Sequence, residues 1–343
     1  GGALVKYINK KKVKLIKLPV HSKNPLLILL NIIFLTLIIL IYKINIVHAR
    51  SRAPAWSCYY ATKITGVKFV TTFHGTYNFK SNLKKSYNKI MLKSDLVIAG
   101  TNFIFSHIND KYPEFVENIK KFLVIFRGIN TEYYDPDNIK NSDKNKLIKS
   151  FKIDMSKKII LLPGRLTEWK GQEMFIEALN ILKNDYGKDQ FQALIVGSDQ
   201  GRQIYKKKLV RLVERFRLNS HVIFIDNIKV MPIIYSIADV VISSSIEPEA
   251  FGRISVEAQS MKKPIIASNI GGSKETIIDN KTGFLFNSND PKSLSSKIDH
   301  VLSLNQATLN SLGNEGRKNV ICKFNVEKMC LSTYSEYKKL INA

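Results

Sequence analysis

The chain has 343 residues, which is long enough for two domains of ordinary size, each with its own core. Hydrophobic residues make up 45% and aromatic residues 10% of it, so the composition excludes an intrinsically disordered chain. Its 53 Lys and Arg against 28 Asp and Glu give a net charge of +25. Such a charge suits an anionic partner such as membrane phospholipid, nucleic acid or a phosphorylated sugar, although a general bias toward Ile, Lys and Asn is the other explanation.

The cysteines and the first residues bear on the cellular compartment. Cys58, Cys322 and Cys330 are too few and too irregularly spaced for a disulfide framework or a zinc site. We therefore expect free thiols in a reducing cytoplasm. The chain opens with Gly1-Gly2 and a basic stretch, so we predict no signal peptide. The lack of an initiator Met fits a fragment of a longer protein.

The first long apolar run covers residues 26–42 and is interrupted only by Asn31 and Thr36. These 17 residues stand at the lower limit for a transmembrane helix. Because the run leads straight into a strand pattern at 44–47, we predict instead a helix that is buried on all sides against a sheet. A peripheral helix that faces a membrane on one side is the intermediate alternative.

Two predicted strands, 44–47 and 68–72, are each followed by a histidine, and two arginines come shortly after the first histidine. The residues concerned are His48, Arg50, Arg52 and His74. Side chains at the carboxyl ends of parallel strands point into a crevice and not into the core. A single His is usually structural, but two at equivalent positions favour a substrate-facing edge, with arginines suited to a carboxylate or phosphate.

The rest of the first half alternates strands and helices, with further strands predicted at 96–99 and 122–126, which is typical of a Rossmann-like domain. Residues 136–156 are polar and charged, so we predict a linker there. Asp135 and Asp137 at its start have the spacing of a metal-binding pair. Asp and Pro are ordinary turn formers, however, so we expect a turn and no metal.

The second half opens with a predicted strand at 158–162, a loop that contains Arg165 and Lys170, and a helix at 172–182. Two cations and the free amides of a helix start form a cradle for an anion. A surface loop with two unrelated cations is the alternative. Strands are also predicted at 191–196 and 222–225.

Residues 240–272 are the most informative stretch. An apolar run ends in serines, a loop with Pro248 and Gly252 follows, and a helical pattern leads to a second apolar run at 264–267. This order indicates a strand, loop, helix and strand of a parallel sheet, where ligands collect at the carboxyl ends of the strands.

Glu249 lies in that loop, and Glu257 stands eight positions later, in the first turns of the helix. A carboxylate near a helix N-terminus is favoured by the helix dipole, so Glu257 by itself could be a cap. The pair flanks a glycine turn whose amides can hold an anion. Together they indicate a ligand that carries both phosphate and hydroxyl groups.

These residues carry a family resemblance. Glu249 and Glu257, with the Ser-rich strand end before them and Gly271-Gly272 and Glu275 after them, resemble the donor-site signature of the retaining GT-B-fold glycosyltransferases of family 4. The resemblance covers at least residues 158–297. It implies an α/β fold of two Rossmann-like domains, with parallel sheets, helices on both faces and a cleft between the domains.

The resemblance also implies a division of the chain. We expect an N-terminal acceptor-side domain over 1–135, completed by a crossover helix at 326–343, a linker over 136–156, and a C-terminal nucleotide-sugar-binding domain over 157–325. Family members begin with a strand and a glycine-rich loop that approaches the donor phosphates. No such pattern precedes residue 26 in this sequence, so we expect the first strand-loop unit to be missing.

The resemblance further implies transfer of a sugar from a nucleotide diphosphate sugar to an acceptor. Arg165 and Lys170 are expected to neutralise the diphosphate in place of a metal, so neither a metal nor another cofactor is expected. Glu257 is expected to hold the ribose hydroxyls, and Glu249 to contact the donor sugar. The remaining candidates are Asn227, Ile228, Phe251, Gly252, Arg253 and Ile254 for donor binding, His74 beside Glu249 for catalysis, and His48, Arg50 and Arg52 on the acceptor side.

The expected acceptor is a lipid-linked or other glycan of the cell envelope, such as a glycolipid or a lipopolysaccharide-type glycan. The net charge and the apolar run at 26–42 predict peripheral binding to an anionic membrane surface, on the cytoplasmic face of the plasma membrane. A GT-B-fold epimerase or phosphorylase is the alternative enzyme. A basic nucleic-acid-binding protein is the alternative outside enzymes, but no helix-turn-helix, finger or aromatic platform motif is present, so no nucleic-acid partner is expected.

Overall fold

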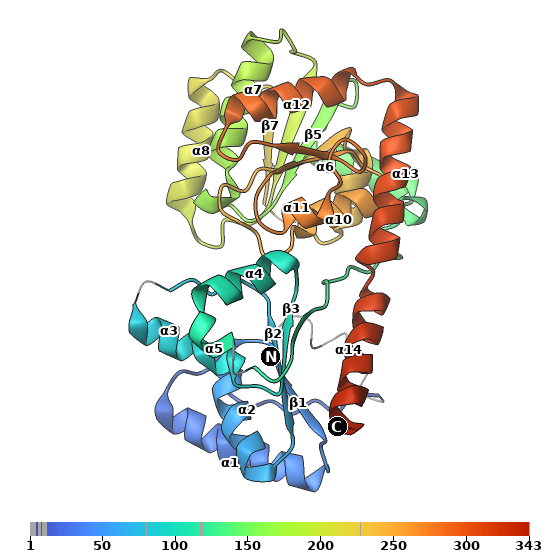
Figure 1. The fold of residues 1–343 in the computed structure, drawn as a ribbon. Helices are drawn as coiled ribbons and strands as arrows, with labels where there is room; N and C mark the ends of the chain where they lie inside the picture. The colour runs from blue at the N-terminus through green and yellow to red at the C-terminus, as the bar shows by residue number, and fades with distance from the viewer. Residues whose placement is uncertain are drawn as a thin grey trace. The chain divides into compact units, whose positions relative to one another are not determined.

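A computed structural model of the chain describes residues 5, 8, 12–79, 81–116, 119–226 and 228–342. The chain divides into two compact units (Figure 1). Unit 1 is drawn from residues 1–100, 104–124 and 334–343, and unit 2 from residues 101–103 and 125–333.

Unit 1 is built on a parallel four-stranded sheet in the order β1-β2-β3-β4. The strands are β1 (Ile46–Ala49), β2 (Lys68–Phe73), β3 (Leu96–Ala99) and β4 (Phe122–Val124). The helical segments before and between them are α1 (Pro25–Ile41), α2 (Arg52–Thr65), α3 (Asn82–Asn88), η2 (Lys89–Leu92), α4 (Asn102–Lys111) and α5 (Pro113–Val116). Residues of β2 and β3 are buried almost throughout, as is usual for parallel strands covered on both faces.

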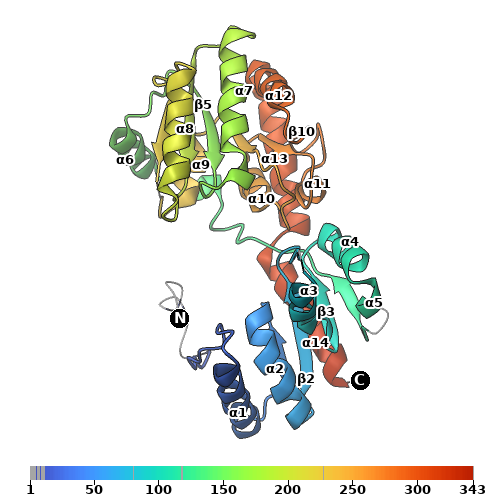
Figure 2. The ribbon, with the colours of Figure 1, turned by 90° about the vertical axis from the view of Figure 1, so that its left-hand side faces the viewer.

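Helix α1 corrects the prediction of a helix buried on all sides. Its start is well defined, because Asn24 accepts a hydrogen bond from the Leu26 amide and Pro25 occupies the first turn. Only Asn31 and Ile39 of the helix are buried. One side packs on α2, beside which it lies in Figure 2. The other side is apolar and exposed, at Leu26, Leu29, Leu30, Ile33, Phe34, Leu37, Leu40 and Ile41. Among the described residues, no helix has both the length and the apolar character that crossing a membrane requires.

Unit 2 is built on a parallel six-stranded sheet in the order β10-β9-β8-β5-β6-β7. The strands are β5 (Lys158–Pro163), β6 (Phe191–Val196), β7 (Val222–Ile225), β8 (Val240–Ser243), β9 (Ile265–Ser268) and β10 (Phe284–Phe286). The chain enters at β5, runs outward through β6 and β7, and returns to the other side of β5 with β8. The switch point of the sheet, where ligands bind in folds of this class, therefore lies between β5 and β8.

Helices cover both faces of this sheet. They are η3 (Pro136–Asn138), α6 (Asn141–Phe151), η4 (Glu168–Lys170), α7 (Gln172–Asn184), α8 (Gln203–Arg215), α9 (Met231–Ile237), α10 (Arg253–Ser260), α11 (Ser273–Thr276), α12 (Pro291–Ser303) and α13 (Gln306–Lys323). Alternate residues of β5 enter two cores: Ile160 and Leu162 pack with α7, α8 and α12, whereas Ile159 and Leu161 pack with α6, α9, α10 and α13. Two parallel sheets flanked by helices confirm the predicted α/β class.

The segment predicted as a linker, 136–156, forms η3 and α6 and belongs to unit 2. Leu147 of α6 is buried in the core of that unit, and α6 packs on α9. The break between units follows residue 124, whereas the sequence pattern places a border after 135. The last helix, α14 (Val326–Asn342), contributes residues to both units. All three cysteines are free.

Candidate functional site

Lys170 and Glu249 form an ion pair at the carboxyl ends of β5 and β8. The Nζ atom of Lys170 lies 2.6 Å from Oε1 of Glu249, and the two side chains are only 12% and 10% exposed. The hydroxyl of Ser245 donates a second hydrogen bond to the same carboxylate oxygen at 2.5 Å. Since a carboxylate with few partners is costly to bury, these contacts fix the position of Glu249.

The backbone around this pair depends on a close approach of two loops. Gly171 has φ +69°, and a Cβ atom there would lie 2.0 Å from the carbonyl oxygen of Ser244. The Ser244 hydroxyl donates to the carbonyl of Lys170 at 2.9 Å, and the Ile246 amide donates to the carbonyl of Trp169 at 2.9 Å. The loop after β5 is therefore joined directly to the loop after β8, which brings Lys170 to Glu249.

Gly271 and Gly272, which follow β9, pack directly against the backbone of the loop that contains Glu249. The amide of Gly272 donates to the carbonyl of Glu249 at 2.7 Å. At Gly271, with φ +57°, a Cβ atom would meet the Glu249 backbone at 2.6 Å. A side chain at either position would push the loop away, which explains the physical need for this Gly-Gly pair.

Glu257 lies on the second turn of α10 and is 6% exposed. Its Oε1 atom accepts a hydrogen bond from Nε of Arg253 at 2.6 Å, and its Oε2 atom accepts one from the hydroxyl of Tyr235 at 2.9 Å. Tyr235 is fully buried on α9. One hydrogen bond on each oxygen therefore holds the carboxylate, which lies beyond the first turn of α10 and does not cap the helix.

The other donor-side candidates of unit 2 differ in their surroundings. Arg165 is exposed, and its carbonyl accepts a hydrogen bond from the Gln172 side chain at 2.9 Å. Phe251 packs in the core against Phe324, so its side chain serves the fold. Gly252, with φ +78°, caps α10.

Two more of the predicted donor residues lie in α10 and in the loop after β7. Ile254 is half-buried, and a Cβ atom added at Gly164, in the loop that follows β5, would lie 3.9 Å from its Cδ1 atom. Ile228 packs partly on the core of unit 2. Asn227 lies outside the described residues.

In unit 1 the prediction that His48 follows a strand is wrong, because His48 lies within β1. Its Nε2 atom is 2.7 Å from the Thr72 hydroxyl, and its Nδ1 atom contacts the hydroxyl of Tyr337 on α14. Burial, reinforced by the nearby charge of Arg50, lowers the pKa of His48 to about 4. This imidazole is therefore neutral at neutral pH and has a protein partner at each nitrogen.

The other candidates of unit 1 include one pair that meets directly. Nε of Arg50 donates to Nε2 of His74 at 3.0 Å. Arg52 donates to Oδ1 of Asn88 at 2.8 Å, and its guanidinium lies 4.5 Å from the centroid of the Tyr77 ring. Arg50 and His74 thus form one polar group at the ends of β1 and β2, separate from the partners of Arg52.

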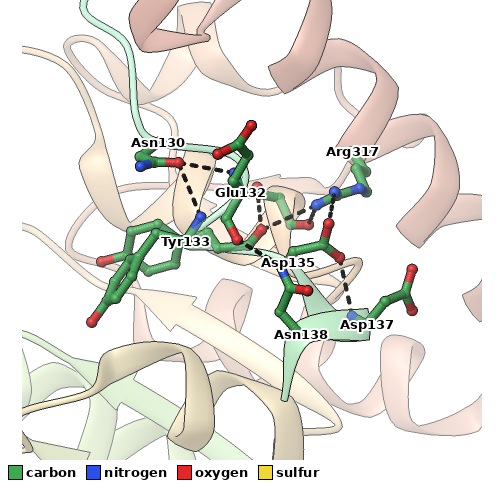
Figure 3. Close-up of polar contacts among 9 residues, drawn as sticks. Asn130, Glu132, Tyr133, Asp135, Asp137, Asn138 and Arg317 are labelled. Atoms are coloured by element: carbon green, nitrogen blue, oxygen red, sulfur yellow. Dashed lines mark hydrogen bonds and ion pairs between the residues drawn. The ribbon is translucent and has the colours of Figure 1, made fainter.

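Asp135 and Asp137 belong to a capped turn (Figure 3). Oδ1 of Asp135 accepts from the Asp137 amide at 3.0 Å, and its Oδ2 atom lies 2.6 Å from Nη2 of Arg317. Arg317 also donates to the carbonyls of Tyr134 and Ser260, at 3.1 and 2.6 Å. Within the described ranges, no group of three or more His, Cys, Asp and Glu side chains is arranged to hold a metal ion.

The sequence did not indicate Tyr235, which donates a hydrogen bond to Glu257, or Ser245, which donates one to Glu249. Tyr235 stands in an apolar helical pattern, where an aromatic residue reads as core, and nothing in the pattern shows where its hydroxyl points. The sequence pattern shows Ser245 only as part of a Ser-rich strand end. Its position four residues before Glu249 was the available signal.

Comparison with known proteins places this geometry in a family. The family model for "Glycosyl transferases group 1" matches residues 143–319, and the model for "Glycosyltransferase Family 4" matches residues 8–133. A crystal structure of a glycosyltransferase from Rickettsia africae ESF-5 is 40% identical with a TM-score of 0.89, covering 99% of this chain and 88% of that one.

Other similar proteins have lower sequence identity. Anabaena Alr3699/HepE in complex with UDP-glucose is 21% identical with a TM-score of 0.79, covering 91% of this chain and 82% of that one. Spore coat protein SA of Bacillus subtilis is 24% identical over 87% of this chain and 79% of its own length. The chain spans 48% and 63% of two further curated relatives. The chain belongs to the group 1, family 4 glycosyltransferases and is a transferase with the GT-B fold.

Proposed function

We propose that this chain transfers a sugar, with retention of anomeric configuration, from a nucleotide diphosphate sugar to an acceptor hydroxyl. The observation that carries the proposal is the contact between Lys170 and Glu249, 2.6 Å apart at the switch point of the unit 2 sheet. A localised cation and a localised carboxylate at this place match the two charges of the reaction: a leaving diphosphate and an electron-poor sugar ring.

Each side chain has a proposed task. In the reaction the bond from the anomeric carbon to the diphosphate oxygen breaks, the acceptor oxygen bonds to that carbon, and the proton of the acceptor hydroxyl passes to the leaving diphosphate. Lys170 and Arg165, with the amides at residues 251–253, stabilise the negative charge that develops on the diphosphate. Glu249 faces the sugar, whose ring carries positive charge in the transition state. Glu257 accepts hydrogen bonds from the ribose hydroxyls and so acts in donor binding.

A screen of nucleotide sugars tests which base and which sugar the donor carries. HepE, which shares the fold, was solved with UDP-glucose. UDP sugars are therefore the first donors to test, followed by GDP and ADP sugars, by their effect on the unfolding temperature. A ligand that binds only the folded chain raises that temperature. A rise with one nucleotide family identifies the base, and no rise with any of them contradicts the donor site.

For the acceptor we propose a lipid-linked or other cell-envelope glycan, such as a glycolipid or lipopolysaccharide-type glycan. The polar group of Arg50 and His74 supports an anionic acceptor, because Arg is suited to phosphate and carboxylate. Product analysis with an envelope lipid extract tests this. A new glycoside supports transfer, whereas a changed free nucleotide sugar without acceptor supports the epimerase alternative, and a sugar phosphate supports the phosphorylase alternative.

We also propose peripheral binding to an anionic membrane on its cytoplasmic face. The exposed apolar side of α1 supports it. Lys23 and Lys43 lie just before and after the helix, and Lys14 packs on the ring of Tyr42 at its carboxyl end. A helix of this kind inserts its apolar side at the headgroup level, and each nearby Lys contributes about 1 kcal/mol at an anionic surface.

Liposome flotation tests the membrane proposal. Recovery with anionic vesicles should fall from low to high salt and should fall further for Phe34→Ser, which removes exposed apolar area from α1. Val230→Ser, an exposed apolar residue of unit 2, is the matched control and should float like the unchanged chain. Equal recovery with neutral vesicles, or none with either, contradicts the proposal.

A further inference from the structure

The partners of Glu257 are unequal in rigidity. Arg253 reaches the carboxylate with a side chain that is 65% exposed, so water and salt compete for that contact. Tyr235 is fully buried, on a helix that packs in the core of unit 2. The hydrogen bond from its hydroxyl to Oε2 of Glu257, at 2.9 Å, is therefore the rigid contact of the two.

The hydroxyl of Tyr235 also stays a donor. Burial, together with the charge of Glu257 and the neighbouring Tyr134, raises the pKa of Tyr235 well above its ordinary value. The phenol therefore remains protonated and keeps donating to Oε2. A carboxylate oxygen accepts more than one hydrogen bond, so each oxygen of Glu257 retains capacity for a ligand hydroxyl.

Tyr134 supports this arrangement from a second element. Its ring lies edge-on to that of Tyr235, with centroids 6.1 Å apart, and the charges of Glu257 and Arg253 act on its hydroxyl. Its backbone carbonyl accepts hydrogen bonds from the Ser260 hydroxyl at 2.6 Å and from Arg317 at 3.1 Å. These two contacts hold Tyr134 in place beside Tyr235.

We propose that Tyr235, supported by Tyr134, is a positioning residue that orients Glu257 and so sets the preference of the donor site for ribose over 2′-deoxyribose. The proposal rests on the proposed role of Glu257 in binding the ribose. A carboxylate oriented by a rigid hydrogen bond presents its remaining lone pairs in a fixed direction, and two vicinal hydroxyls can use them together. If the carboxylate can rotate, part of the binding energy is lost in fixing its orientation, and ribose gains less over 2′-deoxyribose, which has a single hydroxyl.

The test compares Tyr235→Phe with Ser236→Ala. The first removes only the hydroxyl that reaches Glu257, whereas Ser236 donates within its own helix, to the carbonyl of Ile233 at 2.7 Å. Calorimetric titration gives the Kd of UDP and of 2′-deoxy-UDP for each chain. For the unchanged protein we expect UDP to bind about tenfold or more tightly, the value of one hydrogen bond to a charged group.

Tyr235→Phe should reduce that preference several-fold, mainly through weaker UDP binding, and should raise the donor KM with little change in kcat. Ser236→Ala should keep the preference. A wild-type preference in Tyr235→Phe overturns the proposal. If Tyr235→Phe does not fold, Tyr134→Phe takes its place, with a smaller loss expected and the same overturning result.

Glu257→Gln separates this inference from the function on which it rests. If Glu257→Gln abolishes the preference and the tyrosine variants keep it, the positioning role fails and the ribose role stands. If Glu257→Gln itself binds UDP and 2′-deoxy-UDP as the unchanged chain does, the ribose role fails.

Discussion

The Nζ atom of Lys170 lies 2.6 Å from Oε1 of Glu249, although the two residues are 79 positions apart. The pair is nearly buried and is shared with the hydroxyl of Ser245. An arriving diphosphate therefore meets a lysine that already has an anionic neighbour. Part of the charge of Lys170 is balanced before the donor binds, and the carboxylate of Glu249 is held in position beside it.

Loss of a cradle cation should weaken donor binding. Arg165→Ala and Lys170→Ala should each reduce the affinity for the nucleoside diphosphate by about 1.5 to 3 kcal/mol, the value of a hydrogen bond to a charged group. Calorimetry measures this at a temperature where both variants are folded. Lys188→Ala is the matched control, because Lys188 pairs with Asp299 before the amino end of β6. Unchanged affinity in both cradle variants would remove these residues from the site.

Glu249 and Glu257 should separate in kinetics. Glu249→Gln should lower kcat with a smaller change in KM, because the carboxylate acts on the sugar as its bond to phosphate breaks. Glu257→Gln should raise the donor KM, because the ribose contact exists before the reaction. Steady-state rates over a range of donor concentrations show both effects. Wild-type rates in both variants would contradict the assignment of Glu249 and Glu257 to the donor site.

Ser245→Ala should resemble a mild form of Glu249→Gln. The hydroxyl of Ser245 donates to Glu249 at 2.5 Å, so its loss leaves the carboxylate held by Lys170 alone. We expect kcat to fall by roughly tenfold or less, with KM nearly unchanged. Ser150→Ala on α6, whose hydroxyl bonds only within its helix in the described contacts, should behave like the unchanged chain. A KM effect as large as the kcat effect would contradict a role confined to Glu249.

Chelation should leave transfer intact. Arg165 and Lys170 are expected to neutralise the diphosphate, so rates measured with EDTA should equal those without it. Restoration of a lost rate by Mg²⁺ or Mn²⁺ alone would show that a metal takes this task.

His48 should contribute to acid sensitivity of the fold. The pKa of His48 in the folded chain is about 4, below its ordinary value near 6.5, so the unfolded chain binds a proton more readily between those values. The stability that this neutral histidine provides is present above about pH 6.5 and is lost as the pH falls toward 4. The unfolding temperature of His48→Gln should fall less than that of the unchanged chain between pH 7 and pH 4.5. An equal fall in both would exclude His48 as a source of this dependence.

Strands of the second half were the most predictable part of the fold. The predicted strands 191–196 and 222–225 coincide with β6 and β7, because short apolar runs between polar residues identify the strands of a parallel sheet. Hydrophobicity did not reveal what covers a helix, so α1 was predicted as buried and is largely exposed. Most residues of α6 are polar or charged, and Leu147 is the one residue of this helix that is buried. A single buried residue gives no clear helical pattern, so the sequence predicts a linker there.

The site was predictable as a set of residues but not as a set of contacts. The spacing of Glu249 and Glu257 in a strand, loop and helix pattern was sufficient to name both. Pairing of Lys170 with Glu249 depends on the approach of two loops that Gly171 permits, and no local pattern contains that information. The contact of Tyr235 with Glu257 depends on the rotation of α9 against α10, which only the packed structure defines.

The central claim is tested most directly by the anomeric configuration of a transferred sugar. Proton NMR of the product formed from an α-linked nucleotide sugar and an envelope lipid acceptor gives that configuration. The account predicts an α-linked glycoside whose rate of formation falls sharply in Glu249→Gln. A β-linked glycoside, or a donor that is converted without any glycoside, would contradict it.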